Sequence, residues 1–354
     1  MAHRVVHCGT GYVGSLGLRT LLQQPDLELV GLYVTSPEKV GRDAGALVGA
    51  APTGVRATND WDALLALGAD CLTYYGDSVD REREAIEDLV PFLERGTNAV
   101  TISGWEVGHV ATMPNDLRAL VEAACRKGDS SCYFTGSDPG YATSELAIAA
   151  LGLANRVDSV RVLEFACFAN YTAEYPSREY FGFGKPPGFQ PILVTGGKIE
   201  QMWSPTLHRI ADVLEVEIDE LRTGYETDTV AYDLEVGFGV VEAGTAAIVH
   251  FQLEALHRGR VFAAVEHVDR LPRDPRAAGT QWPQPYGPDA SFRVEIEGDP
   301  TFNLEVGGHT SFFNVMPVIN CIPALCRAPA GVVSPVDMPR YWSRNVTARL
   351  GPWP

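Results

Sequence analysis

Cysteine pairs of the C-x-x-C type are absent from this chain of 354 residues. Its seven cysteines are scattered through apolar segments, at positions 8, 71, 125, 132, 167, 321 and 326. An odd number of dispersed thiols indicates reduced, buried cysteines and a cytoplasmic location rather than a disulfide framework. Neither H-E-x-x-H nor a His/Cys cluster with zinc spacing occurs in the sequence, so no metal site is expected.

Positive charge and long apolar runs are also scarce. The chain has 28 lysines and arginines against 45 aspartates and glutamates, a formal net charge of -17, and it has no basic block. Such a chain repels polyanions, which argues against nucleic acid and anionic membranes as partners. No apolar run approaches the roughly 18 residues of a membrane span. The apolar segment after Arg4 is too short for a signal peptide, so secretion is not expected.

The composition that remains is ordinary for a globular protein, with 45% hydrophobic and 21% charged residues. Over the first 136 residues, short apolar runs alternate with segments of helical periodicity. This alternation predicts an α/β fold with a Rossmann-type, doubly wound parallel sheet. The expected strands are 4–8, 27–34, 70–75, 98–102 and 131–135, and the expected helices are 13–24, 60–67, 81–95 (kinked at Pro91) and 114–127.

After Gly136 strands dominate, which predicts an α+β substrate and dimerisation domain with a mostly antiparallel sheet. Two loops rich in proline, glycine and aromatics, 180–189 and 270–287, are either surface loops or lids over a pocket. The expected strands are 159–168, 245–256, 261–268, 292–296 and 302–306. The expected helices are 141–153, 205–214 with Ser204 as its N-cap, and 312–326, broken by Pro317 and Pro323.

The strongest motif is a G-x-G-x-x-G string, formed by Gly9, Thr10, Gly11, Tyr12, Val13 and Gly14. It follows an apolar strand, opens a helix and begins a strand–helix–strand unit of about thirty residues. The first glycine permits a tight turn, the second lets a pyrophosphate approach the backbone, and the third lets helix and strand pack closely. The helix N-terminus attracts phosphates. The motif therefore predicts a dinucleotide site rather than a purely structural turn.

The end of the second strand indicates which dinucleotide is bound. An NAD site usually places a carboxylate there to bind the ribose diol, but no carboxylate occurs here before Glu38. Thr35 and Ser36 offer hydroxyls, and Lys39 and Arg42 follow. These four could hold a 2′-phosphate by charge-assisted hydrogen bonds. We therefore expect NADP(H) as the preferred cofactor, with NAD(H) the alternative if the two cations form only a solvated face.

The most suggestive position for catalysis is Glu106, just beyond the strand 98–102, after Ser103-Gly104 and beside Trp105. Ligands of open α/β sheets bind beyond the carboxyl ends of the strands, so this carboxylate could lie over a nicotinamide. The alternative is a glutamate that merely opens an exposed loop.

Over its whole length the sequence resembles the 2,4-diaminopentanoate dehydrogenases and the related native NAD(P)-dependent amine dehydrogenases, a branch of the dihydrodipicolinate reductase-like group. Three stretches carry the resemblance: 5–14 with 36–41, then 103–106, and finally Gly136-Ser137-Asp138-Pro139-Gly140-Tyr141, where family members resemble G-x-N-P-G-F. Dihydrodipicolinate reductase itself is a poorer match, because its H-H-x-x-K signature is missing and the segment 170–177 contains no lysine.

The resemblance implies reductive amination of a small or medium ketone or aldehyde with ammonia, and the reverse deamination, with Glu106 as acid/base. It implies that Ser103 and Asp138 contact the cofactor. The residues considered for the substrate pocket are Trp105, Tyr141, Tyr171, Tyr175, His309 and Thr310. It also implies a homodimer and three segments: 1–137 binding the dinucleotide, 138–311 binding substrate and forming the dimer, and 312–354 returning to the first domain.

Two positions depart from the family pattern. Val107 stands where family members carry a second acidic residue, and Asp138 stands where they carry asparagine, so the amide donor is lost. Two other functions on the same scaffold are therefore kept open. One is an NADP(H)-dependent carbonyl reductase or alcohol dehydrogenase, which would consume cofactor without ammonia. The other is a non-catalytic NADP(H)-binding regulator, which would bind cofactor without turnover.

Overall fold

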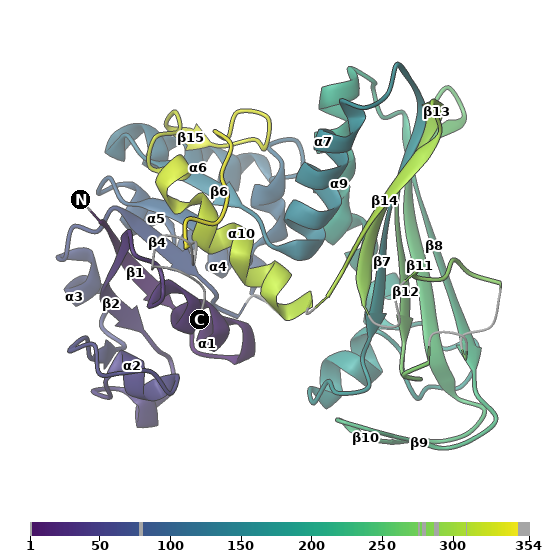
Figure 1. Cartoon of the computed structure of the whole chain (residues 1–354), viewed down its shortest axis with the longest axis horizontal. Helices are drawn as coiled ribbons and strands as arrows, with labels where there is room; N and C mark the ends of the chain where they lie inside the picture. Colours follow the sequence, from purple (N-terminus) through teal and green to yellow (C-terminus); the bar gives the residue numbers. More distant parts are fainter. Residues whose placement is uncertain are drawn as a thin grey trace, which may run out of the picture. The chain divides into compact units, whose positions relative to one another are not determined.

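The fold comes from a computed structural model that describes residues 2–77, 81–274, 277, 281–286, 290–308 and 310–345. The chain divides into two compact units, shown by sequence colour in Figure 1. Unit 1 comprises Met1–Tyr141 and Ser311–Pro354, and unit 2 comprises Ala142–Thr310. Each unit has its own sheet and its own hydrophobic core.

Unit 1 contains a seven-stranded sheet in the order β15-β6-β5-β4-β1-β2-β3, and every neighbouring pair is parallel. This confirms the predicted doubly wound sheet. The strands are β1 (His3–Cys8), β2 (Leu27–Tyr33), β3 (Ala57–Thr58), β4 (Cys71–Tyr74), β5 (Asn98–Thr101), β6 (Ser131–Phe134) and β15 (Gly331–Val332).

Successive residues of a strand point to opposite sides of the sheet. Because apolar residues of these strands point to both sides, helices cover both faces. Val5 lies in the core with α1 and α10, whereas Val6 lies in the core with α3 to α6. The predicted helix 81–95 is divided into α4 and α5 just before Pro91, which lies in the first turn of α5. The helices are α1 (Tyr12–Leu21), α2 (Ala44–Leu47), α3 (Trp61–Leu65), α4 (Glu82–Glu87), α5 (Val90–Leu93), α6 (Asn115–Gly128) and α10 (Thr310–Leu325), with short turns at Pro37–Lys39 and Trp105–Gly108.

Helix α10 corrects one prediction, since it runs unbroken through Pro317 and Pro323. Two internal prolines cost about 6 kcal/mol. Five of its branched aliphatic side chains are fully buried, and each such burial contributes about 1.5–3 kcal/mol, so burial outweighs the two breaks. The five are Val315, Val318, Ile319, Ile322 and Leu325.

Unit 2 contains a six-stranded sheet in the order β14-β13-β7-β12-β11-β8. Only β7 and β12 are parallel neighbours, which confirms the predicted mostly antiparallel sheet. A separate hairpin pairs β9 with β10. The strands are β7 (Arg156–Cys167), β8 (Glu220–Thr229), β9 (Leu234–Val236), β10 (Gly239–Val241), β11 (Ala246–His257), β12 (Arg260–Arg270), β13 (Ser291–Asp299) and β14 (Phe302–Gly307).

The helices of unit 2 correct two predictions and confirm a third. Helix α9 (Lys198–Leu214) begins seven residues before Pro205, so Ser204 is a buried interior residue and not an N-cap. The early turns form because Trp203 packs on Phe251 of β11, with ring centroids 4.8 Å apart. The expected helix 141–153 is present: after the non-helical residues 138–140, π-helical turns run to Glu145 and continue as α7 (Leu146–Leu151). A short turn Pro176–Tyr180 and helix α8 (Ile192–Thr195) complete the unit.

The segment 180–189 is not simply a surface loop. Phe183 is fully buried and Tyr180 is 8% exposed, and both belong to the core of unit 2. Phe183 packs on Phe168 at the end of β7, with ring centroids 5.4 Å apart. Its aromatics therefore fold inward and stabilise the sheet. Over the described residues, no helix has the length and apolarity needed to cross a membrane.

Candidate functional site

The glycine loop connects β1 to α1 in unit 1. Gly9 has a φ of 101°, and a Cβ there would lie 2.6 Å from the carbonyl oxygen of Tyr75. A Cβ on Gly14 would lie 2.5 Å from the carbonyl oxygen of Gly9. Neither position can hold a side chain without moving backbone, so these two glycines are explained by the turn and by helix–strand packing.

Gly11 has no such explanation within the chain. A Cβ there would meet no described atom within 4 Å, and its φ is an ordinary -70°. Every other described glycine with this much open space has a positive φ, which accounts for its identity. The absence of a side chain at Gly11 therefore leaves room for something outside the chain. A pyrophosphate that approaches the backbone closely fits this position.

Helix α1 begins directly after this space, with Gly11 as an N-cap that provides no side-chain hydrogen bond. The amide of Ser15 donates to the carbonyl of Gly11 at 2.8 Å, which is the first bond along the helix. The amides of a first turn are available to caps or ligands, and the helix dipole favours an anion there. Val13 lies in this turn, and Tyr12 is 79% exposed.

A lysine lies at the same loop. The ammonium of Lys39 donates to the carbonyl oxygen of Thr10 at 3.0 Å and to its hydroxyl at 3.1 Å. Among the described residues neither Lys39 nor Arg42 forms an ion pair. Thr35 and Arg42 are exposed and Ser36 is half-buried. The ammonium of Lys39 thus lies beside the glycine loop and is bonded there to neutral oxygens, where a phosphate group would bind it.

The tips of β4 and β5 are tied together by hydroxyl hydrogen bonds. Ser103 donates from Oγ to the carbonyl of Gly76 at 2.6 Å, and Thr101 donates from Oγ1 to the carbonyl of Ser103 at 2.8 Å. The structure therefore places Ser103 at the predicted edge of the sheet, with its hydroxyl used to join two strand tips.

Glu106 follows in a short turn beyond β5. Gly104 opens this turn, and a Cβ there would lie 2.5 Å from Cγ1 of Ile86, so the turn packs closely on α4. Glu106 is 8% exposed, and its carbonyl accepts a hydrogen bond from the hydroxyl of Thr112 at 3.2 Å. The glutamate is therefore buried, with its backbone bonded to Thr112, and does not open an exposed loop.

The third motif is fixed by the C-terminal helix. Oδ1 of Asn314 on α10 accepts hydrogen bonds from the amide of Ser137 at 3.1 Å and from its hydroxyl at 2.5 Å. Asp138 follows, and the ring of Tyr141 packs edge-on against Tyr341, 5.6 Å between centroids. All these segments follow parallel strands of one sheet, so the glycine loop, Glu106 and Asp138 lie at its carboxyl edge.

The remaining predicted pocket residues are distributed unevenly. Trp105 is half-buried beside Glu106 in unit 1. Tyr171 and Tyr175 belong to unit 2 and are 44% and 52% exposed. His309 lies outside the described residues, and so does the side chain of Thr310.

Sequence reasoning missed the residues beneath the loop. His7 on β1 and Thr73 on β4 are both fully buried and hydrogen-bonded to one another at 2.9 Å. The signal was a histidine and a threonine inside otherwise apolar strands, because buried polar side chains require partners.

The fold and this edge of the sheet define an NAD(P)-dependent oxidoreductase. Solved structures with the same fold include an amine dehydrogenase from Mycobacterium smegmatis, with a TM-score of 0.77, 21% identity and 98% of each chain covered. Another is dipicolinate-bound dihydrodipicolinate reductase from Paenisporosarcina sp. TG-14, with a TM-score of 0.50, 14% identity and coverage of 93% of this chain and 97% of the reductase. No family model matches the sequence.

An amine dehydrogenase from Streptomyces virginiae is 30% identical to this chain, and the match covers 97% of each protein. The chain belongs to the amine dehydrogenase family. The family resemblance and the oxidoreductase class inferred from the motifs are thereby confirmed.

Proposed function

We propose that the protein is an NAD(P)H-dependent amine dehydrogenase that aminates a small or medium ketone or aldehyde with ammonia and catalyses the reverse deamination. The observation that carries this proposal is the position of Glu106, a carboxylate 8% exposed at the tip of β5. It lies at the edge of the sheet where the glycine loop begins, with only β4 between β5 and β1. Membership of the amine dehydrogenase family supports the choice of substrate.

Glu106 performs two proton transfers in this reaction. Its carboxylate takes a proton from ammonium, so that the free amine attacks the carbonyl carbon. It returns the proton to the hydroxyl of the resulting carbinolamine, which leaves as water, and its negative charge stabilises the iminium that forms. One carbonyl compound, one ammonium ion and one hydride equivalent thus give one amine and one water.

The bound nicotinamide dinucleotide supplies that hydride. The first turn of α1 and the space at Gly11 would hold its pyrophosphate. Lys39 and Arg42, with the hydroxyls of Thr35 and Ser36, would hold a 2′-phosphate, so NADP(H) is the preferred cofactor.

The substrate pocket is proposed to include Trp105 and Tyr141, which belong to the same unit as Glu106. Asp138 offers carboxylate acceptors to the ribose of the cofactor.

The active form is proposed to be a homodimer joined through unit 2. Helices α7 and α9 pack on one face of its sheet. On the other face the ion pair of Arg161 with Glu266 lies beside Leu163, which the chain itself buries. The proposal of a dimer therefore rests on the family resemblance. Sedimentation equilibrium should give twice the subunit mass, and a single-subunit mass would contradict the dimer.

The decisive experiment replaces Glu106 with glutamine and follows NADPH oxidation with a panel of carbonyl compounds, with and without ammonium. The wild type should require ammonium, and Glu106→Gln should lower kcat by about 100-fold to 10,000-fold because the proton transfers are lost. Glu122→Gln is the control, since Glu122 pairs with two arginines of its own helix, Arg118 and Arg126, on the exposed face of α6. Full activity in Glu106→Gln would remove the proposed role, and turnover without ammonium would identify a carbonyl reductase.

A further inference from the structure

A histidine that the proposed reaction does not use lies directly beneath the glycine loop. His7 on β1 is fully buried. Its Nε2 lies 3.0 Å from the carbonyl oxygen of Gly9 and 2.9 Å from that of Gly14. Its Nδ1 lies 2.9 Å from the hydroxyl oxygen of Thr73 on β4. One imidazole thus touches the first and third glycines of the fingerprint and the neighbouring strand.

These partners determine the tautomer of His7. A carbonyl oxygen can only accept a hydrogen bond, so Nε2 must carry the proton and donate to both carbonyls. Nδ1 is then the acceptor, and the hydroxyl of Thr73 donates to it. Burial keeps the ring neutral, since it lowers the pKa of His7 to about 4. The neutral ring satisfies every one of its hydrogen-bonding positions with this geometry.

The bonds to the carbonyls orient the peptide groups of the loop. In a trans peptide the C=O and the N–H point in opposite directions. Because the carbonyl of Gly9 points inward to His7, the amide of Thr10 points away from the buried ring. The carbonyl of Gly14 is held in the same way at the far end of the motif, so the turn has a fixed span.

The surrounding packing supports this arrangement. The ring of Tyr75 lies 5.2 Å from that of His7, at an interplanar angle of 32°. The backbone of Tyr75 also limits the space at Gly9. The imidazole therefore has fixed neighbours on the sheet side and cannot turn away from the loop.

We propose that His7 is a positioning residue for the dinucleotide: its Nε2–H ties the carbonyls of Gly9 and Gly14 inward and so presents the loop amides and the start of α1 to the pyrophosphate. The inference rests on the proposed function for the identity of the ligand. The proposal makes cofactor binding depend on His7, a residue outside the G-x-G-x-x-G motif.

The test compares four variants of the full chain. His7→Leu removes the donor, His7→Gln keeps an amide N–H that can reach a carbonyl, and Thr73→Val removes the hydroxyl that orients the ring. Thr97→Val is the matched control, because Thr97 is a buried threonine of the same unit whose hydroxyl donates to Ala69 at 2.9 Å, away from the loop. NADPH and NADH dissociation constants are measured by fluorescence titration, and amide hydrogen exchange of residues 9–15 is measured without ligand.

His7→Leu should weaken both cofactors by at least about tenfold and speed exchange in residues 9–15, because one donor to two carbonyls is lost. His7→Gln should stay within about threefold of the wild type, and Thr97→Val should change neither readout. Wild-type affinity and wild-type exchange in His7→Leu would overturn the proposal. If His7→Leu does not fold, Thr73→Val decides: a loss of about threefold or more supports the proposal, and an unchanged affinity overturns it.

The exchange measurement separates this proposal from the proposed function. If the wild type binds neither NADPH nor NADH, the proposed cofactor is wrong. Faster exchange of residues 9–15 in His7→Leu would still show that the tie orders the loop, whereas unchanged exchange would overturn it.

Discussion

In unit 2 the buried Arg293 is matched by carboxylates, whereas Lys39 beside the glycine loop of unit 1 donates to neutral oxygens. Arg293 is 5% exposed and pairs with Glu305 at 2.7 Å and Glu295 at 3.3 Å. Lys39 donates only to Thr10, and no described residue forms an ion pair with it. A cation that is paired with carboxylates inside the chain has little attraction left for an anionic ligand. A cation without an ion-pair partner at a surface loop can still bind one.

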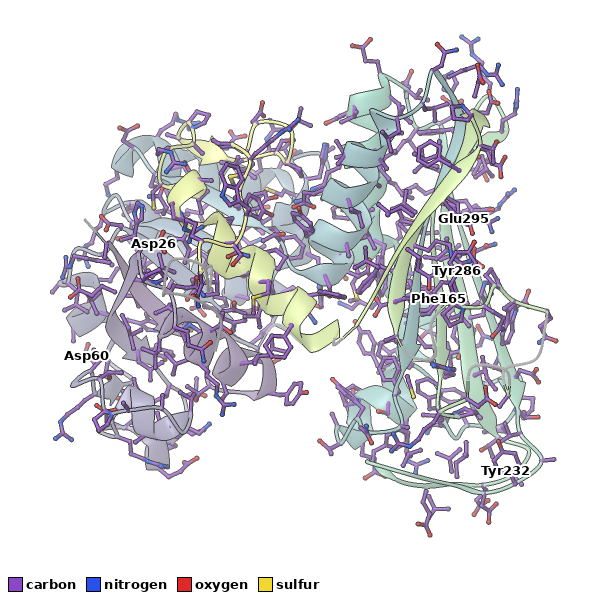
Figure 2. All side chains as sticks on the ribbon, in the orientation of Figure 1. Asp26, Asp60, Phe165, Tyr232, Tyr286 and Glu295 are labelled. Carbon is purple, nitrogen blue, oxygen red and sulfur yellow. The ribbon has the colours of Figure 1, made fainter. Side chains whose placement is uncertain are left out.

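This difference also explains how a chain with a formal net charge of -17 can bind a phosphate-bearing ligand. The overall field is unfavourable for anions, so affinity must come from local donors. Unit 1 has them at the start of α1 and on Lys39. In unit 2 the charge of Arg293 is neutralised by Glu305 and Glu295, and Figure 2 labels Glu295 on this sheet. Lys39 and the start of α1 are thus available to an anionic ligand, whereas the charge of Arg293 is used within unit 2.

The largest expected effect comes from breaking the buried pairing in unit 2. Arg293 lies between the rings of Phe165 and Tyr286, 4.8 and 4.0 Å from their centroids. Arg293→Leu should lower the free energy of unfolding by about 3–5 kcal/mol, since Glu305 would remain buried without its partner. Urea denaturation at fixed protein concentration measures this.

The matched control for that variant is Arg156→Leu. Arg156 pairs with Asp158 at 3.0 Å, but both side chains are largely exposed. Its loss should cost at most about 1 kcal/mol. Cofactor affinity should be unchanged in both variants. If Arg293→Leu raised the cofactor dissociation constant, the buried pairing in unit 2 would serve cofactor binding as well as stability.

The second prediction concerns acid stability of unit 1. The pKa of His7 is lowered from its ordinary 6.5 to about 4, so between these values the unfolded chain binds a proton that the folded chain does not. Stability is therefore complete above about pH 6.5 and is lost as the pH falls toward about 4. Between about pH 7.5 and about pH 5 the contribution of this one group is roughly 2 kcal/mol.

That contribution is measured as a difference between two proteins, because other groups titrate in the same range. Urea denaturation of the wild type and of His7→Gln is compared at the two pH values. The wild type should lose about 2 kcal/mol more than the variant. Equal losses would show that the burial of His7 does not govern acid unfolding.

How well the sequence predicts each unit depends on how far apart in the sequence the contacting residues lie. Five of the seven strands of unit 1 and the position of Glu106 after β5 follow from local patterns, since each of these strands is a short apolar run. The two-residue strands β3 and β15 are too short to give such a pattern. Strand β8 was missed because Glu220–Thr229 is a polar edge strand whose partner, β11, is recognised only in three dimensions. The sequence predicts that helix α9 starts at Pro205, seven residues after its observed start at Lys198. The earlier turns are stabilised by the packing of Trp203 on Phe251 of the sheet, a contact that the local pattern does not show.

The same reason separates the parts of the site. The glycines, Lys39 and Glu106 could be named from short motifs. The bonds that hold them join residues far apart in the sequence: His7 to Thr73 over 66 positions, and Ser137 to Asn314 over 177. No period or motif encodes such a pair, so the supporting contacts required the fold.

The third prediction tests whether the open space at Gly11 serves a ligand. Gly11→Ala should fold normally, since the new Cβ meets no described atom within 4 Å. It should raise the dissociation constant for NADPH and NADH by about 30-fold, because the methyl group occupies the space of the pyrophosphate.

Gly259→Ala in the β11–β12 hairpin of unit 2 provides the opposite case. Its surroundings are equally open, but its φ is 73°, so alanine should cost about 1 kcal/mol of stability and leave cofactor binding unchanged. Thermal denaturation and fluorescence titration distinguish the two outcomes. If Gly11→Ala bound cofactor like the wild type, the space would have no ligand role.

The smallest expected effect comes from replacing Lys39, which has no ion-pair partner among the described residues, and the control replaces a lysine that has one. Lys39→Met should weaken NADPH by about tenfold and NADH by less than about threefold, because only NADPH carries the 2′-phosphate. Lys185→Met should change neither, since Lys185 is paired with Glu179 at 2.6 Å in unit 2. Equal losses for both cofactors in Lys39→Met would assign Lys39 to the loop through Thr10 and not to the phosphate. Unmatched charge would then serve to shape the loop, and the preference for NADP(H) would have to rest on Arg42.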